Sequence, residues 1–321
     1  MSKRNPAPLL AGLAAFLAIA LIAAAANAPY VFAEYAAHFT RHEIVDPGPV
    51  KIARGRMFDD YWSVETIGPD TYALGEPRFY QQNYSYLLVG KSRALMFDAG
   101  SGTRDILPVI RSLTSLPVTV IPSHLHSDHT GGIAPFKFVA MLDIPRLRAE
   151  TRAGVFRPSR YEFLGMGDRK TAPDIPVAEW VRPGGFIDLG ERRVQVLNTP
   201  GHTPNGVSVF DGARRMLFTG DYIYTTTLYA FAPGASLSAY RETAKTLLAT
   251  LPHDTILWTA HCCRHGEDAA APWLGMGDLS DLLAALDKRE RGTLKGTGFY
   301  PVRYPVNNQM TLATGFGWTN P

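Results

Sequence analysis

The sequence predicts an α+β fold that follows an apolar N-terminal segment, and three observations support this expectation. First, 46% of the 321 residues are hydrophobic and 19% are charged, a globular composition that excludes collagen, long coiled coils and wholesale disorder. Second, short apolar runs with strand character alternate with turn residues through most of the chain. Third, a few segments carry apolar residues at the spacing of one helix face.

The N-terminal segment begins with basic residues and continues with apolar ones. Lys3 and Arg4 precede an apolar run over residues 9–28, which ends in small residues. This order is typical of a secretory signal, and a run of about 20 residues is also long enough to span a bilayer as one helix. We therefore expect residues 1–28 to be a signal peptide or a signal anchor. The rest of the protein is expected to be exported, either periplasmic or anchored to the inner membrane and facing outward.

Three regions follow this segment. We expect residues 29–66 to form an N-terminal extension with several aromatic side chains. Residues 67–270 are expected to form the main domain, and residues 271–321 a C-terminal helix and tail. The predicted strands are short apolar runs bounded by turn residues, and they are Thr71–Leu74, Tyr84–Val89, Ala94–Phe97, Val118–Ile121, Phe138–Leu142, Val194–Leu197, Val207–Phe210, Met216–Phe218 and Thr255–Trp258. Helices are expected over Ile106–Leu113, near Leu237–Leu251 and near Leu279–Leu286.

Residues 144–185 differ from the rest of the main domain because they are rich in Arg, Pro and Gly. They predict a helix followed by a long excursion. Since long loops in compact domains often carry function, the excursion is expected either to cover a site as a lid or to be a plain surface insertion.

The charge balance gives no reason to expect a nucleic-acid partner. Lys and Arg number 32 and Asp and Glu 29, so the formal net charge is only +3, which does not indicate a surface for polyanions. The only cysteines, Cys262 and Cys263, are adjacent, and neighbouring cysteines make a strained and uncommon disulfide. We therefore expect no disulfide framework and interpret both cysteines as packing residues.

One segment concentrates side chains that bind metals. His124, His126, Asp128 and His129 lie within six residues, directly after a predicted strand. Imidazole nitrogen and carboxylate oxygen are the usual ligands of zinc and related divalent metals. Alternate side chains of an extended segment share a face, so the first two histidines can point one way, while the other two residues follow a turn. The segment can therefore supply two adjacent metal sites.

Three further residues repeat this context. His202, Asp221 and His261 each follow an apolar strand and a turn of small residues, and strand ends held by a rigid sheet are common positions for functional sites. The remaining histidines stand alone and are expected to have no role, and they are His38, His42, His253 and His265.

With these residues in this order, the chain resembles the metallo-β-lactamase superfamily of hydrolases. That family has a His-x-His-x-Asp-His block, then a single His, a bridging Asp and a final His. The resemblance implies an αββα sandwich, in which two sheets face each other with helices outside and the metals at one edge. It also implies a first metal held by His124, His126 and His202, a second held by Asp128, His129 and His261, and Asp221 as the bridge between them. Asp98 matches an acid that orients the ligands from behind the site.

The expected cofactors are two divalent metal ions, with zinc the first choice, although manganese and iron accept the same donors. Two ions about 3.5–4 Å apart can share a hydroxide and lower its pKa towards neutrality. The hydroxide would attack a carbonyl carbon, while Asp128 steers it and passes a proton to the leaving group. No Ser or Cys nucleophile is needed for this chemistry.

The expected function is therefore dinuclear hydrolysis of a carboxylic ester or lactone, a small-molecule substrate. Asp221 argues against β-lactam cleavage, because β-lactamases with this block usually lack the bridging Asp. Tyr224, three residues after Asp221, matches a tyrosine that assists at the substrate carbonyl in quorum-quenching lactonases, although it could simply pack. Four alternatives stay open: a thioester hydrolase of the hydroxyacylglutathione type, a β-lactamase, a mononuclear iron persulfide dioxygenase and a non-catalytic binding protein.

Overall fold

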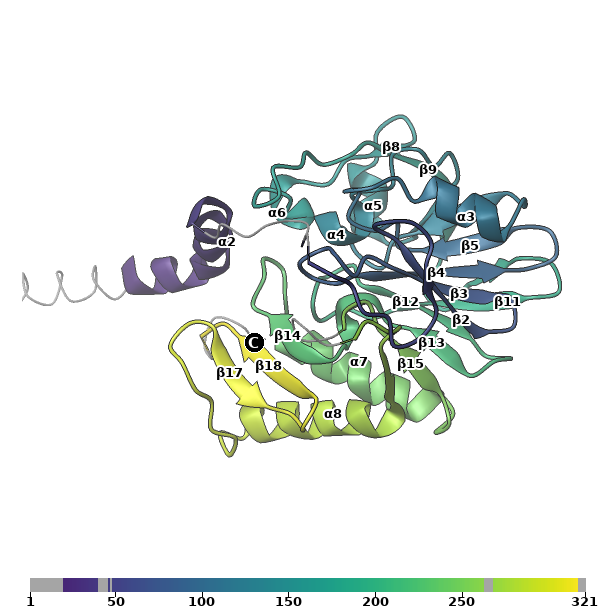
Figure 1. The fold of residues 1–321 in the computed structure, drawn as a ribbon. Coiled ribbons are helices and arrows are strands. Elements are labelled where there is room, and N and C mark those ends of the chain that lie inside the picture. The colour runs from purple at the N-terminus through teal and green to yellow at the C-terminus, as the bar shows by residue number, and fades with distance from the viewer. Residues whose placement is uncertain (1–19, 40–45, 47, 263–267, 317–321) are drawn as a thin grey trace, which may run out of the picture.

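The computed structural model describes residues 20–39, 46, 48–262 and 268–316. Two large sheets form the centre of the molecule and helices flank them on both sides (Figure 1). The flanking helices are α3 (Leu107–Leu113) and α5 (Pro145–Glu150) on one side, and α7 (Leu237–Thr250) and α8 (Met276–Glu290) on the other. The main core collects buried side chains from both sheets, so this arrangement confirms the expected α+β sandwich.

The first sheet has nine strands among the described residues, in the order β1-β2-β3-β4-β5-β6-β7-β9-β8. Its strands are β1 (Arg56–Met57), β2 (Ser63–Gly68), β3 (Thr71–Gly75), β4 (Tyr84–Val89), β5 (Ala94–Phe97), β6 (Val118–Ile121), β7 (Val139–Leu142), β8 (Val155–Phe156) and β9 (Ile175–Val181). β1 to β5 are antiparallel neighbours, whereas β5, β6, β7 and β9 run parallel. Every residue of β5 and β7 is buried, as continuous apolar runs are in a parallel sheet covered on both faces.

The second sheet has six strands in the order β10-β11-β12-β13-β15-β16 within the described part of the chain. Its strands are β10 (Phe186–Asp188), β11 (Arg193–Asn198), β12 (Val207–Asp211), β13 (Met216–Phe218), β15 (Ile256–Trp258) and β16 (Trp273–Gly275). β11, β13 and β15 end within four residues of His202, Asp221 and His261, respectively. The sheet therefore supplies a rigid base for these three side chains.

A smaller third sheet lies at the C-terminal end of the fold. It consists of β14 (Thr226–Ala230), β17 (Val302–Pro305) and β18 (Met310–Thr314), with β18 in the middle. A second core joins its buried leucines to those of α7 and α8. Helix α7 begins where the Ser236 hydroxyl accepts a hydrogen bond from the N–H of Ala239, at 3.3 Å, which satisfies one of its free donors. Residues 271–321, expected as a helix and tail, thus also contain strands.

Two other segments carry more structure than the sequence predicts. The expected N-terminal extension, residues 29–66, contains most of β2, which pairs with β3 in the first sheet. The expected excursion, residues 144–185, contains α5, β8, α6 (Arg160–Phe163) and β9. β9 carries Pro176 and Glu179 and is only partly buried, so its sequence lacks the apolar run by which a buried strand is recognised.

The N-terminal part of the described chain forms a helix, α2 (Ala28–Phe39), beside α6 (Figure 1). Among the described residues, no helix combines the length and apolar character needed to cross a membrane. Most of the apolar run that predicts a signal peptide or anchor lies in residues 1–19, outside the described residues. Export and anchoring therefore stay predictions.

Candidate metal centre

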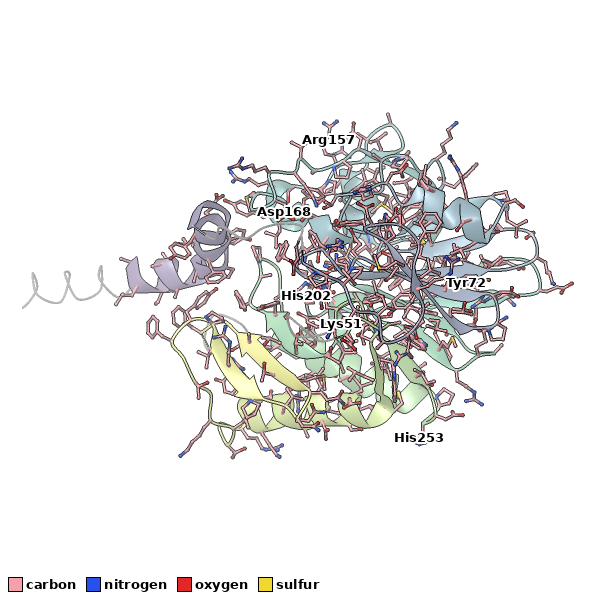
Figure 2. The ribbon with its side chains drawn as sticks, viewed as in Figure 1. Lys51, Tyr72, Arg157, Asp168, His202 and His253 are labelled. Atoms are coloured by element: carbon pink, nitrogen blue, oxygen red, sulfur yellow. The ribbon has the colours of Figure 1, made fainter. Side chains whose placement is uncertain are left out.

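The seven predicted ligand residues come together in two neighbouring groups, and all of them are buried. The first group is His124, His126 and His202, and the second group is Asp128, His129, Asp221 and His261. Within each group, one potential ligand atom from every residue lies within 4.8 Å of the others. Figure 2 shows His202 in the middle of the molecule, whereas His253, for which the sequence predicts no role, lies at its outer edge.

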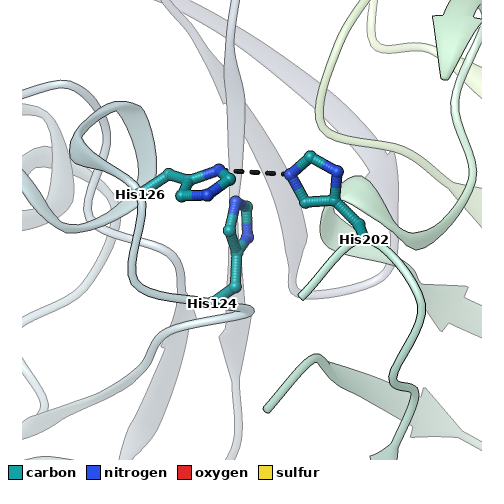
Figure 3. A group of neighbouring side chains, drawn as sticks. All are labelled: His124, His126 and His202. Atoms are coloured by element: carbon teal, nitrogen blue, oxygen red, sulfur yellow. Dashed lines mark hydrogen bonds between the residues drawn. The ribbon is translucent and has the colours of Figure 1, made fainter. Parts of the chain in front are cut away.

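The three histidines of the first group face a common point (Figure 3). His202 Nε2 and His126 Nδ1 are 3.1 Å apart, and the ring of His124 lies 4.4 Å from that of His126 between centroids. His124 Nε2 is buried and has no hydrogen-bond partner among the described residues. Three imidazole nitrogens therefore converge where a cation can accept their lone pairs.

The opposite ring nitrogens are fixed by acceptors. Nδ1 of His202 lies 2.7 Å from the carbonyl oxygen of Tyr229, and Nδ1 of His261 lies 3.2 Å from that of Gln81. Because a carbonyl only accepts, each Nδ1 must carry the proton and donate it. This tautomer leaves both Nε2 atoms free to bind a metal.

Asp98 fixes a third histidine from behind the site, the position that the resemblance implies for it. Its Oδ2 lies 2.8 Å from His129 Nδ1, and its Oδ1 accepts the backbone N–H of Ser123 at 2.6 Å. The Ser123 hydroxyl in turn lies 3.0 Å from His124 Nδ1. One buried carboxylate thus orients His129 of the second group directly, and it touches the first group only indirectly, through Ser123.

The carboxylate of Asp221 reaches both groups. Its Oδ1 lies 3.2 Å from His129 Nε2 and 3.0 Å from His261 Nε2 in the second group. Its Oδ2 lies 3.6 Å from His202 Nε2 in the first group and 3.2 Å from His261 Nε2 in the second group. This is the position that a ligand bridging two cations occupies.

Burial and charge prepare the two groups differently. Burial lowers the pKa of His124 and His202, and lowers that of His126 to about 3, so the first group is neutral and its lone pairs are available. In the second group, burial raises the pKa of the Asp128 and Asp221 carboxyls, but the neighbouring histidines outweigh burial and keep both pKa values low.

The same attraction acts on the histidines of the second group. Burial lowers the pKa of His129 and His261, but the carboxylates beside them outweigh it and raise both pKa values above the usual one. Without metal, the two buried carboxylates therefore favour protons on these histidines. Cations can take the place of these protons.

The residues present fit a pair of divalent cations. His124 Nε2 is buried without a hydrogen-bond partner in the described chain, and such an atom costs about 1–3 kcal/mol if nothing binds it. A void of about 10 Å³, on the scale of one water molecule, lies among His124, His202 and Asp221. The donor set of nitrogen and carboxylate oxygen suits zinc, manganese and iron alike.

Tyr224 is buried beside the second group, and its ring centroid lies 5.1 Å from that of His261. Its hydroxyl oxygen accepts the backbone N–H of Tyr229 at 3.1 Å. Burial raises the pKa of this phenol well above the usual value, so the hydroxyl keeps its proton. The side chain therefore packs and still has one proton to donate.

Two findings about the site were not expected from the sequence. Cys262, which follows the last ligand, is buried and disulfide-bonded, whereas the sequence predicts a packing thiol; Cys263 lies outside the described residues. The carbonyls of Gln81 and Tyr229, and the Asn83 amide that donates to the Asp128 carbonyl at 2.7 Å, also support the ligands. Backbone contacts of this kind leave no side-chain pattern that a single sequence could reveal.

Comparisons with known proteins agree with this geometry. The family model of the metallo-beta-lactamase superfamily matches residues 79–261. The acyl-coenzyme A thioesterase MBLAC2 of Gallus gallus is 24% identical over 216 residues, which cover 59% of this chain and 76% of the relative. The hydroxyacylglutathione hydrolase of Nitrosomonas eutropha is 27% identical over 184 residues, which cover 57% of this chain and 62% of the relative. A solved metallo-beta-lactamase from Pontibacter korlensis has the same fold, with a TM-score of 0.51 and 18% identity. The match covers 70% of this chain and 99% of the solved one.

Proposed function

Because the chain belongs to the metallo-beta-lactamase superfamily and is a hydrolase of that family, we propose that it cleaves an acyl thioester or ester with two divalent cations, zinc first among them. The observation that carries the proposal is the position of Asp221, whose carboxylate lies between the two groups, with Oδ1 3.2 Å from His129 Nε2 and Oδ2 3.6 Å from His202 Nε2. When bound, such a pair of cations activates a water for attack and polarises the carbonyl.

The side chains around the site prepare and complete this reaction. His202, His129 and His261 are held by acceptors at Nδ1, so their orientation is set before substrate arrives. Asp128 Oδ2 lies 3.3 Å from His129 Nε2 and 3.5 Å from His261 Nε2. Since its pKa is low, Asp128 starts as a carboxylate that can accept the proton of the attacking water and pass it to the leaving sulfur or oxygen.

Tyr224 supplies the second catalytic group of the proposal. Its hydroxyl accepts the Tyr229 N–H and retains its own proton. That proton can be donated to the oxygen that becomes negative when the carbonyl is attacked, because donors aimed at a developing charge stabilise the transition state.

A thioester is the first substrate class, ahead of the carboxylic ester or lactone that the sequence favours. Two relatives support this order, since one is named for acyl-coenzyme A and the other for a hydroxyacyl group on glutathione. Sulfur is also the better leaving group, which reduces the demand on Asp128 as a proton donor.

The test is a panel of hydrolysable substrates with the full chain, before and after chelation and metal return. The panel contains an S-acyl-N-acetylcysteamine thioester, S-lactoylglutathione, an acyl-homoserine lactone, an aryl ester and a chromogenic cephalosporin. We expect chelation to abolish thioester cleavage and zinc to restore it. Turnover of the cephalosporin alone would contradict the proposal, as would oxygen consumption with glutathione persulfide by a protein holding one iron.

We also propose that residues 1–28 direct export, as the basic start and apolar run indicate. N-terminal sequencing of the protein recovered from a periplasmic fraction tests this. A new N-terminus near residue 28 indicates cleavage, an intact one in the membrane fraction indicates an anchor, and recovery in the cytoplasm contradicts the proposal.

A further inference from the structure

A cavity of about 540 Å³ opens beside the first group of histidines, within the range of small-molecule sites. Leu125, His126 and Thr203 line its inner side, next to the metal centre. Of the second group, Asp128, His129 and His261 are all absent from its lining. The cavity therefore extends away from the first group and away from Asp128.

The N-terminal helix α2 contributes one residue to the lining of the cavity. Tyr30 of this helix lines the cavity and meets the ring of Tyr161 edge-on, with centroids 4.9 Å apart. The Glu34 carboxylate holds the same segment, because it accepts the Tyr161 hydroxyl at 3.0 Å and pairs with Arg160 at 2.8 Å. Figure 1 shows α2 beside α6, from which both partners come.

A second contact fixes α2 to a segment near the end of β14. Phe32 packs edge-on against Phe231 at 5.1 Å between centroids, and Phe231 precedes Pro233 and Gly234, which also line the cavity. Two segments that are far apart in the sequence thus both pack against one helix, whose Tyr30 lines the cavity.

The charged groups of the lining are already paired. Arg146 Nη1 donates to Glu150 at 2.9 Å and to Glu162 at 2.7 Å, and Arg157 donates to Asp174 through two nitrogens. A carboxylate or phosphate would meet no unpaired cation among these lining residues, and burying an unpaired charge is costly.

Two of the lining residues do carry a polar atom without a hydrogen-bond partner in the described chain. Arg146 Nη2 and Thr203 Oγ1 are buried and make no hydrogen bond to any described residue. Both can donate to an uncharged oxygen, such as that of an amide, a ketone or a hydroxyl. The cavity thus combines apolar and aromatic walls with donors for a neutral acceptor.

We propose that this cavity receives the acyl arm of the substrate, and that the arm is uncharged, mainly apolar and carries an oxygen that accepts from Arg146. The inference rests on the proposed function, because Asp128 must face the leaving atom that takes its proton. The leaving group then lies on the side of the second group, and the acyl arm extends over His126 into the cavity. Tyr30 and Arg146 are specificity-determining residues in this arrangement.

The first test measures chain-length dependence with S-acyl-N-acetylcysteamine thioesters from acetyl to dodecanoyl, using the full chain. We expect kcat/KM to rise about fourfold for each methylene that is buried. In Tyr30→Ala, the loss should grow with chain length and lower the decanoyl-to-acetyl ratio by about tenfold. Val31→Ala is the matched control, because Val31 lies on the same helix, is 64% exposed and does not line the cavity. An equal loss for every chain length in Tyr30→Ala would overturn the proposal.

The second test compares arms that end in a neutral or a charged group. Thioesters of suberic acid with a free carboxamide should be cleaved at least about tenfold faster than those with a free carboxylate. Arg146→Met should remove the advantage of the carboxamide over a plain acyl arm. Arg148 lies on the same helix as Arg146 and pairs with Asp143. The control variant Arg148→Met should therefore keep the advantage of the carboxamide. Preference for the carboxylate would show that the cavity takes an anion instead.

A binding measurement separates this inference from the proposed function. Calorimetry of the metal-free protein with decanamide should give a Kd that Tyr30→Ala weakens about tenfold and Val31→Ala preserves. Binding of decanamide with no thioester turnover would refute the proposed function, but it would still support the assignment of the cavity to an uncharged, mainly apolar ligand. Metal-dependent turnover without chain-length preference or decanamide binding would refute the inference alone.

Discussion

Replacing Asp98 with Asn should weaken one metal site selectively. The Asp98 carboxylate holds His129 Nδ1 at 2.8 Å and the Ser123 N–H at 2.6 Å. Both are donors, and an amide can accept from only one of them while its NH₂ faces the other. One buried donor is then left unpaired, which costs about 1–3 kcal/mol. The loss falls on the second group, which contains His129, and corresponds to about 10- to 100-fold in metal affinity.

Competition titration with a chromophoric chelator measures both dissociation constants of the cation pair. We expect one of them to rise by that factor and the other to change by less than about threefold. Asp254→Asn is the control, because Asp254 is an exposed residue of a surface ion pair with Arg215, and it should alter neither constant. Equal weakening of both sites, or of neither, with an unchanged unfolding midpoint would refute this view of Asp98.

Three further predictions concern acidity, ligand loss and the buried tyrosine. The raised pKa values of His129 and His261 stabilise the metal-free fold below about pH 6.5, and this stability is lost as pH rises through those values. The thermal unfolding midpoint of the chelated protein should therefore fall towards alkaline pH. Added zinc should remove this pH dependence. His126→Ala and Asp221→Ala should each lower kcat more than about 100-fold with the circular dichroism spectrum retained, since losing a ligand costs more than losing its support; full activity in either variant would contradict the ligand assignment. Tyr224→Phe strands the N–H of Tyr229 and should lower the free energy of unfolding by about 1–3 kcal/mol in urea, with a fall in kcat if the hydroxyl assists at the carbonyl; unchanged stability would show that the N–H finds another acceptor.

The sequence predicts the ligand residues because their signal is local. His124 to His129 form one block, and His202, Asp221 and His261 each follow a short apolar strand. The order of these residues and their position after apolar strands can be recognised in the sequence alone, and a sheet brings such strand ends to one edge. Asp98 also directly follows a strand, β5, but its role is predicted from the resemblance to the family rather than from this local signal.

The sequence does not predict the wall of the cavity, because that wall depends on distant contacts. Tyr30 meets Tyr161 across more than a hundred residues, and neither aromatic has a spacing that suggests the other. β9 and the third sheet escape prediction for a related reason. β9 shows no regular alternation in burial, and β17 alternates only between half-buried and exposed residues, so tertiary pairing rather than local pattern determines them.

Metal content per chain is the most direct measure of the central claim. The full-length protein, loaded with zinc and dialysed against metal-free buffer, should retain two zinc ions per chain, and Asp221→Ala should retain fewer. A stoichiometry of one ion or none in the unmodified protein would contradict an account in which Asp221 joins two cation sites.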